Sequence, residues 1–165
     1  MLETVNVRGC EALISLNGLS GLARLRDVTA YSSGIDSLDA LSACPALESV
    51  AVASCGGLNS LEGLRGLACL KSVDASATNI VSVDALQKCP ILEHVYVSNC
   101  RHLTSLEGLS GLRHLKTVAA CSTSVTNIEA LSFCPALVYV DLRDCSQLDS
   151  VDALTEKRGL VVQFP

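Results

Sequence analysis

Aromatic residues are scarce in this chain of 165 residues: they make up 3% of it, and tryptophan is absent. Because 49% of the residues are nevertheless hydrophobic, a core has to be built from leucine, valine, alanine and cysteine, and this richness excludes a disordered chain. No apolar run approaches the length that crosses a bilayer, so no membrane insertion is expected. A net charge of −5 argues against a nucleic-acid partner, which requires a concentrated basic face.

Cysteine is abundant instead, and its nine positions indicate an internal repeat. Seven of them fall in two series with a step of 45 residues, Cys10, Cys55, Cys100, Cys145 and Cys44, Cys89, Cys134. Each unit of 45 residues contains a first-type repeat of 23 residues with the motif C-x-x-L and a second-type repeat of 22 residues with the motif T-x-I. Seven repeats fill a single domain over residues 1–165, and they begin at Glu3, Arg26, Glu48, Lys71, Glu93, Lys116 and Val138.

The first-type repeats have the pattern L-x-x-V-x-V-x-x-C-x-x-L, as in Leu47, Val50, Val52, Cys55 and Leu58, and the second-type repeats have L-x-x-V-x-A-x-x-T-x-I. These patterns resemble that of leucine-rich repeat proteins, with the second-type repeats similar to the internalin type and the first-type repeats similar to the cysteine-containing type. The resemblance implies an α/β solenoid: a right-handed arc with a parallel β-sheet on its concave side and short helical or 3-10 turns on its convex side. It also implies that partners bind on the concave face.

The V-x-V segments alternate with period two and are expected to form the strands. A serine or asparagine then precedes each convex turn and is expected to cap it, at Ser15, Ser37, Ser60, Ser82, Ser105, Asn127 and Ser150. At the end of the chain, residues 161–165 are expected to form a terminating strand. Val162 and Phe164 are there one position out of register with the repeat, and Phe164 is expected to cover the last coil.

The seven periodic cysteines, Cys10 among them, occupy interior positions of the repeat and are interpreted as buried, unpaired thiols. Equivalent cysteines recur only in every second repeat, about 10 Å apart, which is too far for a disulfide. We therefore expect a reducing, cytoplasmic location, no metal site and no cofactor. Cys69 and Cys121 occupy outward positions, and Cys121 is expected to be the most reactive thiol.

Two further regularities are interpreted as structural. The first residues of the repeats alternate in charge from Glu3 to Lys116, which predicts a ladder of ion pairs along one edge of the stack. Paired glycines such as Gly63 and Gly66 lie on the convex turns, where they are expected to keep the surface slim for packing between neighbours. A phosphate-binding loop would need a preceding strand and a following helix, and this context is missing.

Candidate functional residues lie at the outward positions of the strands. All three tyrosines fall there, among 21 such positions. Tyrosine is favoured where proteins bind one another, because its ring is apolar and its tip is polar. We therefore predict a non-enzymatic module that binds a protein or peptide on its concave face, through Tyr31, Asp74, His94, Tyr96, Tyr139, Asp141 and Arg143. A face without any partner in this fragment is the alternative.

Catalysis is not expected. Only His94 of the three histidines lies on the concave face, and although Asp74 is expected near it, an open face has no pocket and no oxyanion site. A structural scaffold is the alternative function: a segment of a larger leucine-rich repeat protein that acts through end-to-end or interdomain packing. Leu2 is already the last leucine of the repeat pattern, so the N-terminal end is uncapped, and self-association through this end is the corresponding expectation.

Overall fold

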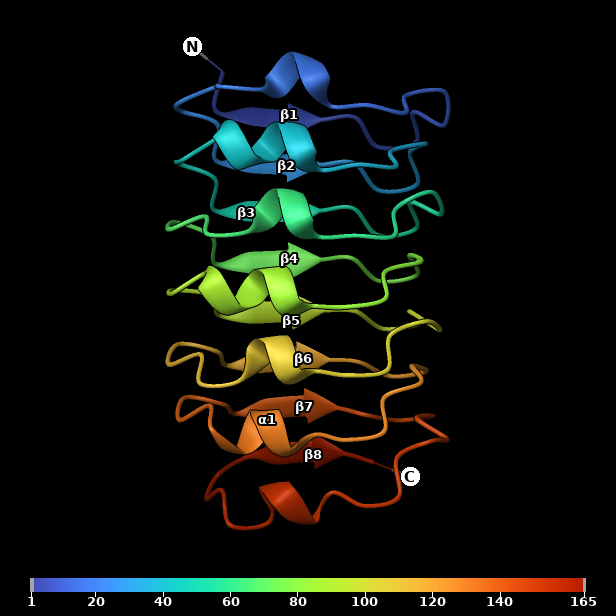
Figure 1. The fold of residues 1–165 in the computed structure, drawn as a ribbon, viewed down its shortest axis with the longest axis vertical. Helices are drawn as coiled ribbons and strands as arrows, with labels where there is room; N and C mark the ends of the chain where they lie inside the picture. Colours follow the sequence, from blue (N-terminus) through green and yellow to red (C-terminus); the bar gives the residue numbers. More distant parts are fainter. Residues whose placement is uncertain (1, 165) are drawn as a thin grey trace.

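The structure, a computed structural model, describes residues 2–164 of the chain. Eight strands follow one another along a single stack and form one parallel sheet in sequence order (Figure 1). The strands are β1 (Thr4–Asn6), β2 (Asp27–Thr29), β3 (Ser49–Ala51), β4 (Ser72–Asp74), β5 (His94–Tyr96), β6 (Thr117–Ala119), β7 (Tyr139–Asp141) and β8 (Val161–Gln163). This sheet is the parallel sheet that the leucine-rich pattern predicts.

Each strand is short because only one of its three side chains points into the core. The central valine of every strand faces inward and stands next to the central valine of its neighbour, as Val50 does between Val28 and Val73. From β2 to β7 these valines are at most 1% exposed, while the residues on either side reach the surface, apart from Asp141 in β7. Branched side chains suit this pleated, half-buried environment.

A short helical turn follows each of the strands β1 to β7, lies across the core from it and forms the second layer (Figure 1). The first-type repeats contribute three-residue turns and the second-type repeats contribute longer ones of four or five residues. The three-residue turns are η1 (Asn17–Leu19), η3 (Glu62–Leu64), η5 (Glu107–Leu109) and η6 (Asp152–Leu154), and the longer ones are η2 (Asp39–Ala43), η4 (Asp84–Lys88) and α1 (Glu129–Ser132).

The serines that precede these turns act one position earlier than predicted. The N-cap position is occupied by a hydrophobic residue such as Leu38, which makes no side-chain capping bond. Ser37 stands before it, and its hydroxyl accepts a hydrogen bond of 3.1 Å from the backbone N–H of Asp39, the first residue of the turn. Equivalent bonds occur before all seven turns. The serine is displaced by one position because the hydrophobic residue at the N-cap has to point into the core.

Six of the periodic cysteines are buried and link neighbouring coils. The thiol of Cys55 donates a hydrogen bond of 3.0 Å to the carbonyl of Ala30, and that of Cys89 donates one of 3.3 Å to Leu64. The thiols of Cys44, Cys100, Cys134 and Cys145 make equivalent bonds to the preceding coil. All nine cysteines, which lie within the described residues, are free. Burial raises the pKa of the Cys89, Cys100 and Cys134 thiols, so these remain protonated donors.

Cys10 departs from the prediction. It is exposed, and its thiol lies 3.9 Å from the carbonyl of Arg8 in its own coil. The equivalent thiols of Cys55, Cys100 and Cys145 are buried because a preceding coil supplies their carbonyl acceptor. Since no coil within residues 2–164 precedes the first one, the interior position of the repeat becomes a surface position there.

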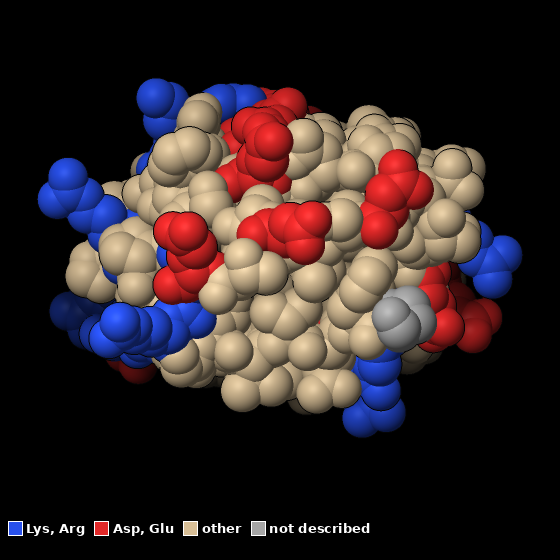
Figure 2. All heavy atoms as spheres, turned by 90° about the horizontal axis from the view of Figure 1, so that it is seen from below, with Lys and Arg blue, Asp and Glu red and all other residues tan. Residues whose placement is uncertain are grey.

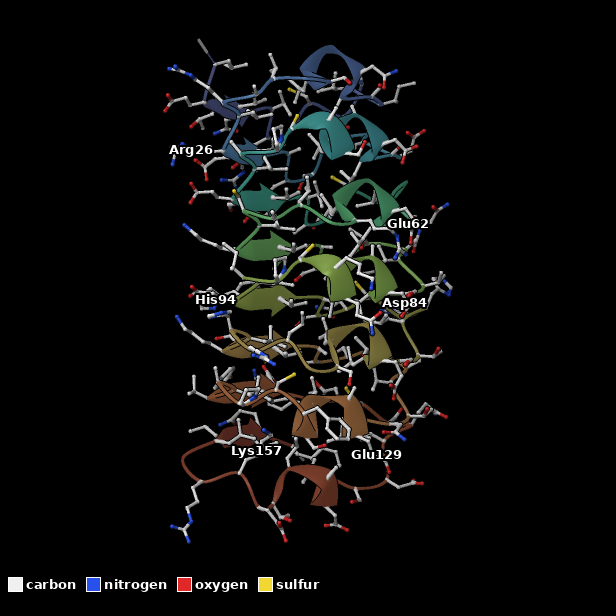
Figure 3. The ribbon with its side chains drawn as sticks, turned by 60° about the vertical axis from the view of Figure 1, so that its left-hand side comes forward. Arg26, Glu62, Asp84, His94, Glu129 and Lys157 are labelled. Carbon is white, nitrogen blue, oxygen red and sulfur yellow. The ribbon has the colours of Figure 1, made fainter. Side chains whose placement is uncertain are left out.

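The C-terminal end closes differently from the earlier repeats. Strand β8 begins one residue early, which removes the offset in register predicted for Val162 and places it beside Val140. Phe164 is partly buried against the core, as expected. Lys157 occupies the position of Leu67 and donates a hydrogen bond of 2.8 Å from its Nζ to the carbonyl of Cys134 (labelled in Figure 3). Acidic and basic side chains surround and partly cover this end of the stack (Figure 2).

Candidate binding face

The outward side chains of the strands form a continuous surface, which we call the strand face. Arg26 and His94 lie on this side of the molecule, whereas Glu62, Asp84 and Glu129 lie on the side of the helical turns (Figure 3). Two hollows of about 260 Å³ each lie between neighbouring helical turns, around Asn127 and around Ser60, and are lined by residues of those turns and the loops before them. Both hollows lie away from the strand face, which we therefore treat as an open surface.

Four of the seven predicted residues come together near the middle of the strand face. Tyr31 follows β2, and its hydroxyl donates a hydrogen bond of 3.3 Å to Oδ2 of Asp74 at the end of β4. Tyr96 lies beside Asp74 in the sheet, and its ring stacks on that of His94 at a centroid distance of 6.4 Å. We call Tyr31, Asp74, His94 and Tyr96 the central cluster.

The central cluster is held in place by the backbone and by charge. Oδ1 of Asp74 accepts a hydrogen bond of 3.0 Å from the backbone N–H of Ser76, which fixes the carboxylate. To reach Asp74, the Tyr31 side chain crosses the third coil, whose outward residues there are the small Ala51 at the end of β3 and Ala53 just after it. Partial burial, together with the negative charge of Asp74, raises the pKa of Tyr31, so its hydroxyl is protonated at neutral pH and acts as a donor.

His94 and Asp74 do not form the pair that the sequence suggested. His94 stands beside Ser72 in the sheet, and its Nε2 lies 3.8 Å from Glu93. Nδ1 of His94 is buried and has no hydrogen-bond partner within residues 2–164. Because Asp74 is occupied by Tyr31 and Ser76, it is not available to orient the imidazole as an acid–base pair would require.

The remaining three predicted residues lie on and just after β7. Arg143 donates hydrogen bonds of 2.9 and 2.7 Å from Nε and Nη2 to the two carboxylate oxygens of Asp141. Asp141 is only 5% exposed, so it is a support for Arg143 and not a contact surface in its own right. The hydrogen bonds from the guanidinium lower the pKa of Asp141 and leave Arg143 as the exposed member of the pair. Tyr139 is partly exposed beside them.

Two exposed valines beside Tyr139 were missed by the sequence prediction. Val138 and Val161 are 53% and 51% exposed, and Val161 is the neighbour of Tyr139 in the sheet. The signal was present in the sequence, because Val138 occupies the position that carries a charge in the six preceding repeats. The C-terminal third of the strand face is therefore more apolar than predicted.

Ion pairs follow the edge of the strand face at three of the five junctions that the alternation of charge predicts. Glu48 accepts hydrogen bonds from Arg26 at 2.7 Å and from Lys71 at 2.6 Å, and Glu93 accepts one from Lys116 at 2.5 Å. These bonds lower the pKa of both glutamates. All five side chains are partly exposed, so we interpret them as aids to strand register worth at most about 1 kcal/mol per pair.

The described residues contain neither a cluster of three or more potential metal ligands nor a helix with the length and apolar character needed to span a membrane. No protein-family model matches the chain, and no curated protein is similar to it in sequence.

Solved structures resemble it closely in fold. Internalin C2 of Listeria monocytogenes aligns with a TM-score of 0.86 and 20% identity over 92% of this chain and 66% of its own. An internalin F of the same organism aligns with a TM-score of 0.76 and 15% identity over 92% of this chain and 50% of its own. This chain thus spans between half and two thirds of those structures. At these identities the similarity concerns the fold, and by its fold the chain is a leucine-rich repeat solenoid of the kind found in internalins.

Proposed function

We propose that the chain is a non-enzymatic module that binds a protein or peptide partner on its strand face. The observation that carries this proposal is the central cluster, in which Tyr31, Asp74, His94 and Tyr96 are already fixed by contacts within the protein. Side chains that are ordered before binding lose less conformational entropy when a partner arrives, and this favours affinity. Aromatic side chains that contact one another at a surface are the usual anchors of protein interfaces.

Shape also supports a macromolecular partner. The Tyr31 side chain crosses the small residues of the third coil to reach Asp74, and Tyr96 stands beside Asp74 on the next strand, so the two tyrosines flank this carboxylate on one continuous surface. A second group of side chains, Tyr139 with Val138, Val161 and Arg143, lies two strands from Tyr96 toward the C-terminal end. At about 4.8 Å per strand, β2 and β7 are about 24 Å apart, a span that suits a protein or an extended peptide.

The proposal is tested by removing the three rings together. We expect the Tyr31→Ala, Tyr96→Ala, Tyr139→Ala variant to lose the proteins that the unaltered chain captures from its source lysate. Each captured protein is then purified and its affinity measured, and a loss of at least about 30-fold is expected if two anchors contribute about 1 kcal/mol or more each.

The matched control replaces three exposed residues outside the strand face, Gln87→Ala and Lys88→Ala in η4 and Arg113→Ala in the loop after η5, and should bind as the unaltered chain does. Circular dichroism and thermal unfolding of both variants ensure that the fold is retained. If the tyrosine variant recovers the same proteins with the same affinity, the strand face is not the binding surface. A cytoplasmic location, which we also propose from the nine free thiols, is tested by fractionation of the source cells.

A further inference from the structure

Asp74, near the middle of the strand face, has no counter-ion in this chain. It takes part in none of the ion pairs within residues 2–164, and it is partly exposed. Its Oδ1 accepts a hydrogen bond of 3.0 Å from the backbone N–H of Ser76, and its Oδ2 accepts a longer one of 3.3 Å from the hydroxyl of Tyr31. Each carboxylate oxygen can accept two hydrogen bonds, so both oxygens have room for a further donor.

The seventh repeat shows which group completes such a carboxylate. Asp141 has the position there that Asp74 has in the fourth repeat. Its Oδ1 accepts a hydrogen bond of 3.2 Å from the backbone N–H of Arg143, just as Asp74 does from Ser76. The guanidinium of Arg143 donates to both oxygens of Asp141 in addition. The backbone bond therefore leaves space for a guanidinium, and Asp74 has the same arrangement without one.

Two tyrosine rings flank Asp74 and favour a planar cation. Tyr31 reaches the carboxylate from the second coil, and Tyr96 stands beside it in the sheet. A guanidinium stacks on aromatic rings and forms two parallel hydrogen bonds to a carboxylate, whereas the ammonium of a lysine acts as a point charge. Ser72 and Ser76, on either side of Asp74 along the chain, are small and partly exposed, so they leave the carboxylate accessible.

Charge burial decides where the cation has to come from. A partner that covers the middle of the strand face removes water from the Asp74 carboxylate, which is unfavourable unless an opposite charge takes the place of the water. Lys71, the cation of the same coil, lies at the edge of the face and pairs with Glu48 at 2.6 Å. The counter-ion of Asp74 therefore has to be supplied by the partner.

We propose that the central cluster is a binding site for an arginine side chain of the protein or peptide partner. The guanidinium lies between Tyr31 and Tyr96 and donates two hydrogen bonds to Asp74, as Arg143 does to Asp141. This inference rests on the proposed function, because it names the chemistry that the strand face recognises.

The probes are three libraries of short peptides displayed on phage, which are random except for a central arginine, lysine or glutamine. Each library is selected on the immobilised chain, and the affinity of individual peptides is then measured by calorimetry. We expect the tightest peptides to come from the arginine library. Replacement of their central arginine by lysine should weaken binding by at least about fivefold, because lysine has no planar fork of donors.

Asp74→Asn removes the charge and keeps the local structure. Asn6 has the same position in the first coil, and its Oδ1 accepts the equivalent backbone bond at 3.2 Å. The variant should weaken the arginine peptides by at least about tenfold, since it removes a charge-assisted pair. Asp27→Asn is the matched control: it removes another carboxylate of the strand face without an ion pair in the described part of the chain, and affinity should stay within about twofold.

Ser76→Arg tests the same site by filling it from within the chain. The new guanidinium has the position of Arg143, so it should pair with Asp74 and weaken the arginine peptides by at least about tenfold. Ser76→Gln is the control for size, because its side chain is long but uncharged. It should weaken binding by less than about threefold. Equal losses for the two variants would contradict the pairing with Asp74.

The variant that lacks the three tyrosine rings separates this inference from the proposed function. If the selected peptides bind that variant as they bind the unaltered chain, the strand face is not their site and both proposals fail. If the peptides need the rings but come equally from the three libraries and bind Asp74→Asn normally, the strand face binds without arginine. That result overturns this inference alone, and so does a replacement of arginine by lysine without loss of affinity.

Discussion

Single residues in left-handed conformations set the start of every turn after a strand. The residue directly after the last outward residue before the turn has a positive φ in each repeat. In six of the seven repeats it is not glycine: Ser32, Ser54, Ala77, Asn99, Ser122 and Asp144. Alanine has no side-chain group that could hydrogen bond locally and offset the unfavourable backbone conformation. Ala77, with a φ of 54°, is therefore the most strained position of this series.

We expect Ala77→Gly to stabilise the protein by about 0.5–1 kcal/mol, because relief of the left-handed strain exceeds the entropy that glycine adds to the unfolded chain. Ala53→Gly is the control: it lies on the same face but outside the residues with positive φ, and it should destabilise. Urea unfolding of both variants measures the difference. Equal destabilisation by both substitutions would show that the strain is negligible.

The thiols should react in the order of their exposure. Cys10 is exposed, Cys69 and Cys121 are partly exposed, and the other six are buried. With iodoacetamide at pH 8, we expect Cys10 to be alkylated first, Cys69 and Cys121 more slowly, and the six buried thiols only on unfolding. Burial keeps the reagent away from the sulfur and disfavours the reactive thiolate. A mass-spectrometric time course of the native and urea-treated chain measures this order. Early labelling of Cys100 would contradict the buried bridge to Ala75.

The helical turns show what the sequence could and could not predict about an element. The periodic leucines, valines and cysteines predicted the positions of the strands and turns correctly, because every coil buries side chains at the same positions of the repeat. The capping serines were displaced by one position, since the serine pattern alone does not tell which neighbour must point inward. The role of Asp141 was missed for a similar reason. Asp141 and Arg143 are two residues apart on one face, which predicts that they are close but not that Arg143 buries Asp141.

Ser82→Ala tests the role of the serine before a turn. It removes the hydrogen bond of 2.9 Å that the Ser82 hydroxyl accepts from the backbone N–H of Asp84. We expect a loss of about 0.5–1 kcal/mol in the free energy of unfolding, as for other local side-chain bonds to the start of a turn. Ser20→Ala, at an exposed site after η1, should change stability by less than about 0.5 kcal/mol. A neutral Ser82→Ala would mean that water replaces the hydroxyl fully.

For the whole molecule, stability is distributed along the stack because, apart from the Tyr31–Asp74 hydrogen bond, each coil packs on its immediate neighbours. Contacts between helical turns and between strands join consecutive elements only, which is the arrangement of a one-dimensional array. The C-terminal end has β8, Phe164 and Lys157 to close it, whereas the first coil packs on one side only. The array should therefore open from its N-terminal end.

Hydrogen exchange should show this gradient. We expect the lowest protection in residues 3–25, the highest in the coils from residue 48 to residue 115, and intermediate protection in the last coil. A chain extended at its N-terminus by a copy of residues 71–92 is the control, since it should transfer the lowest protection to the added coil. Uniform protection along the chain would show that the seven coils open as a single cooperative unit.

Finally, the alternation of first-type coils, which have short turns, with second-type coils, which have longer turns, limits how such a protein can change its length. Removing residues 48–92 joins a second-type coil to a first-type coil and leaves every junction of a kind that already exists. Removing residues 48–70 alone brings two second-type coils together, a junction that does not occur within residues 2–164. Recombination between copies of the gene should therefore be tolerated when it adds or removes whole pairs of coils, and array length should change in even steps.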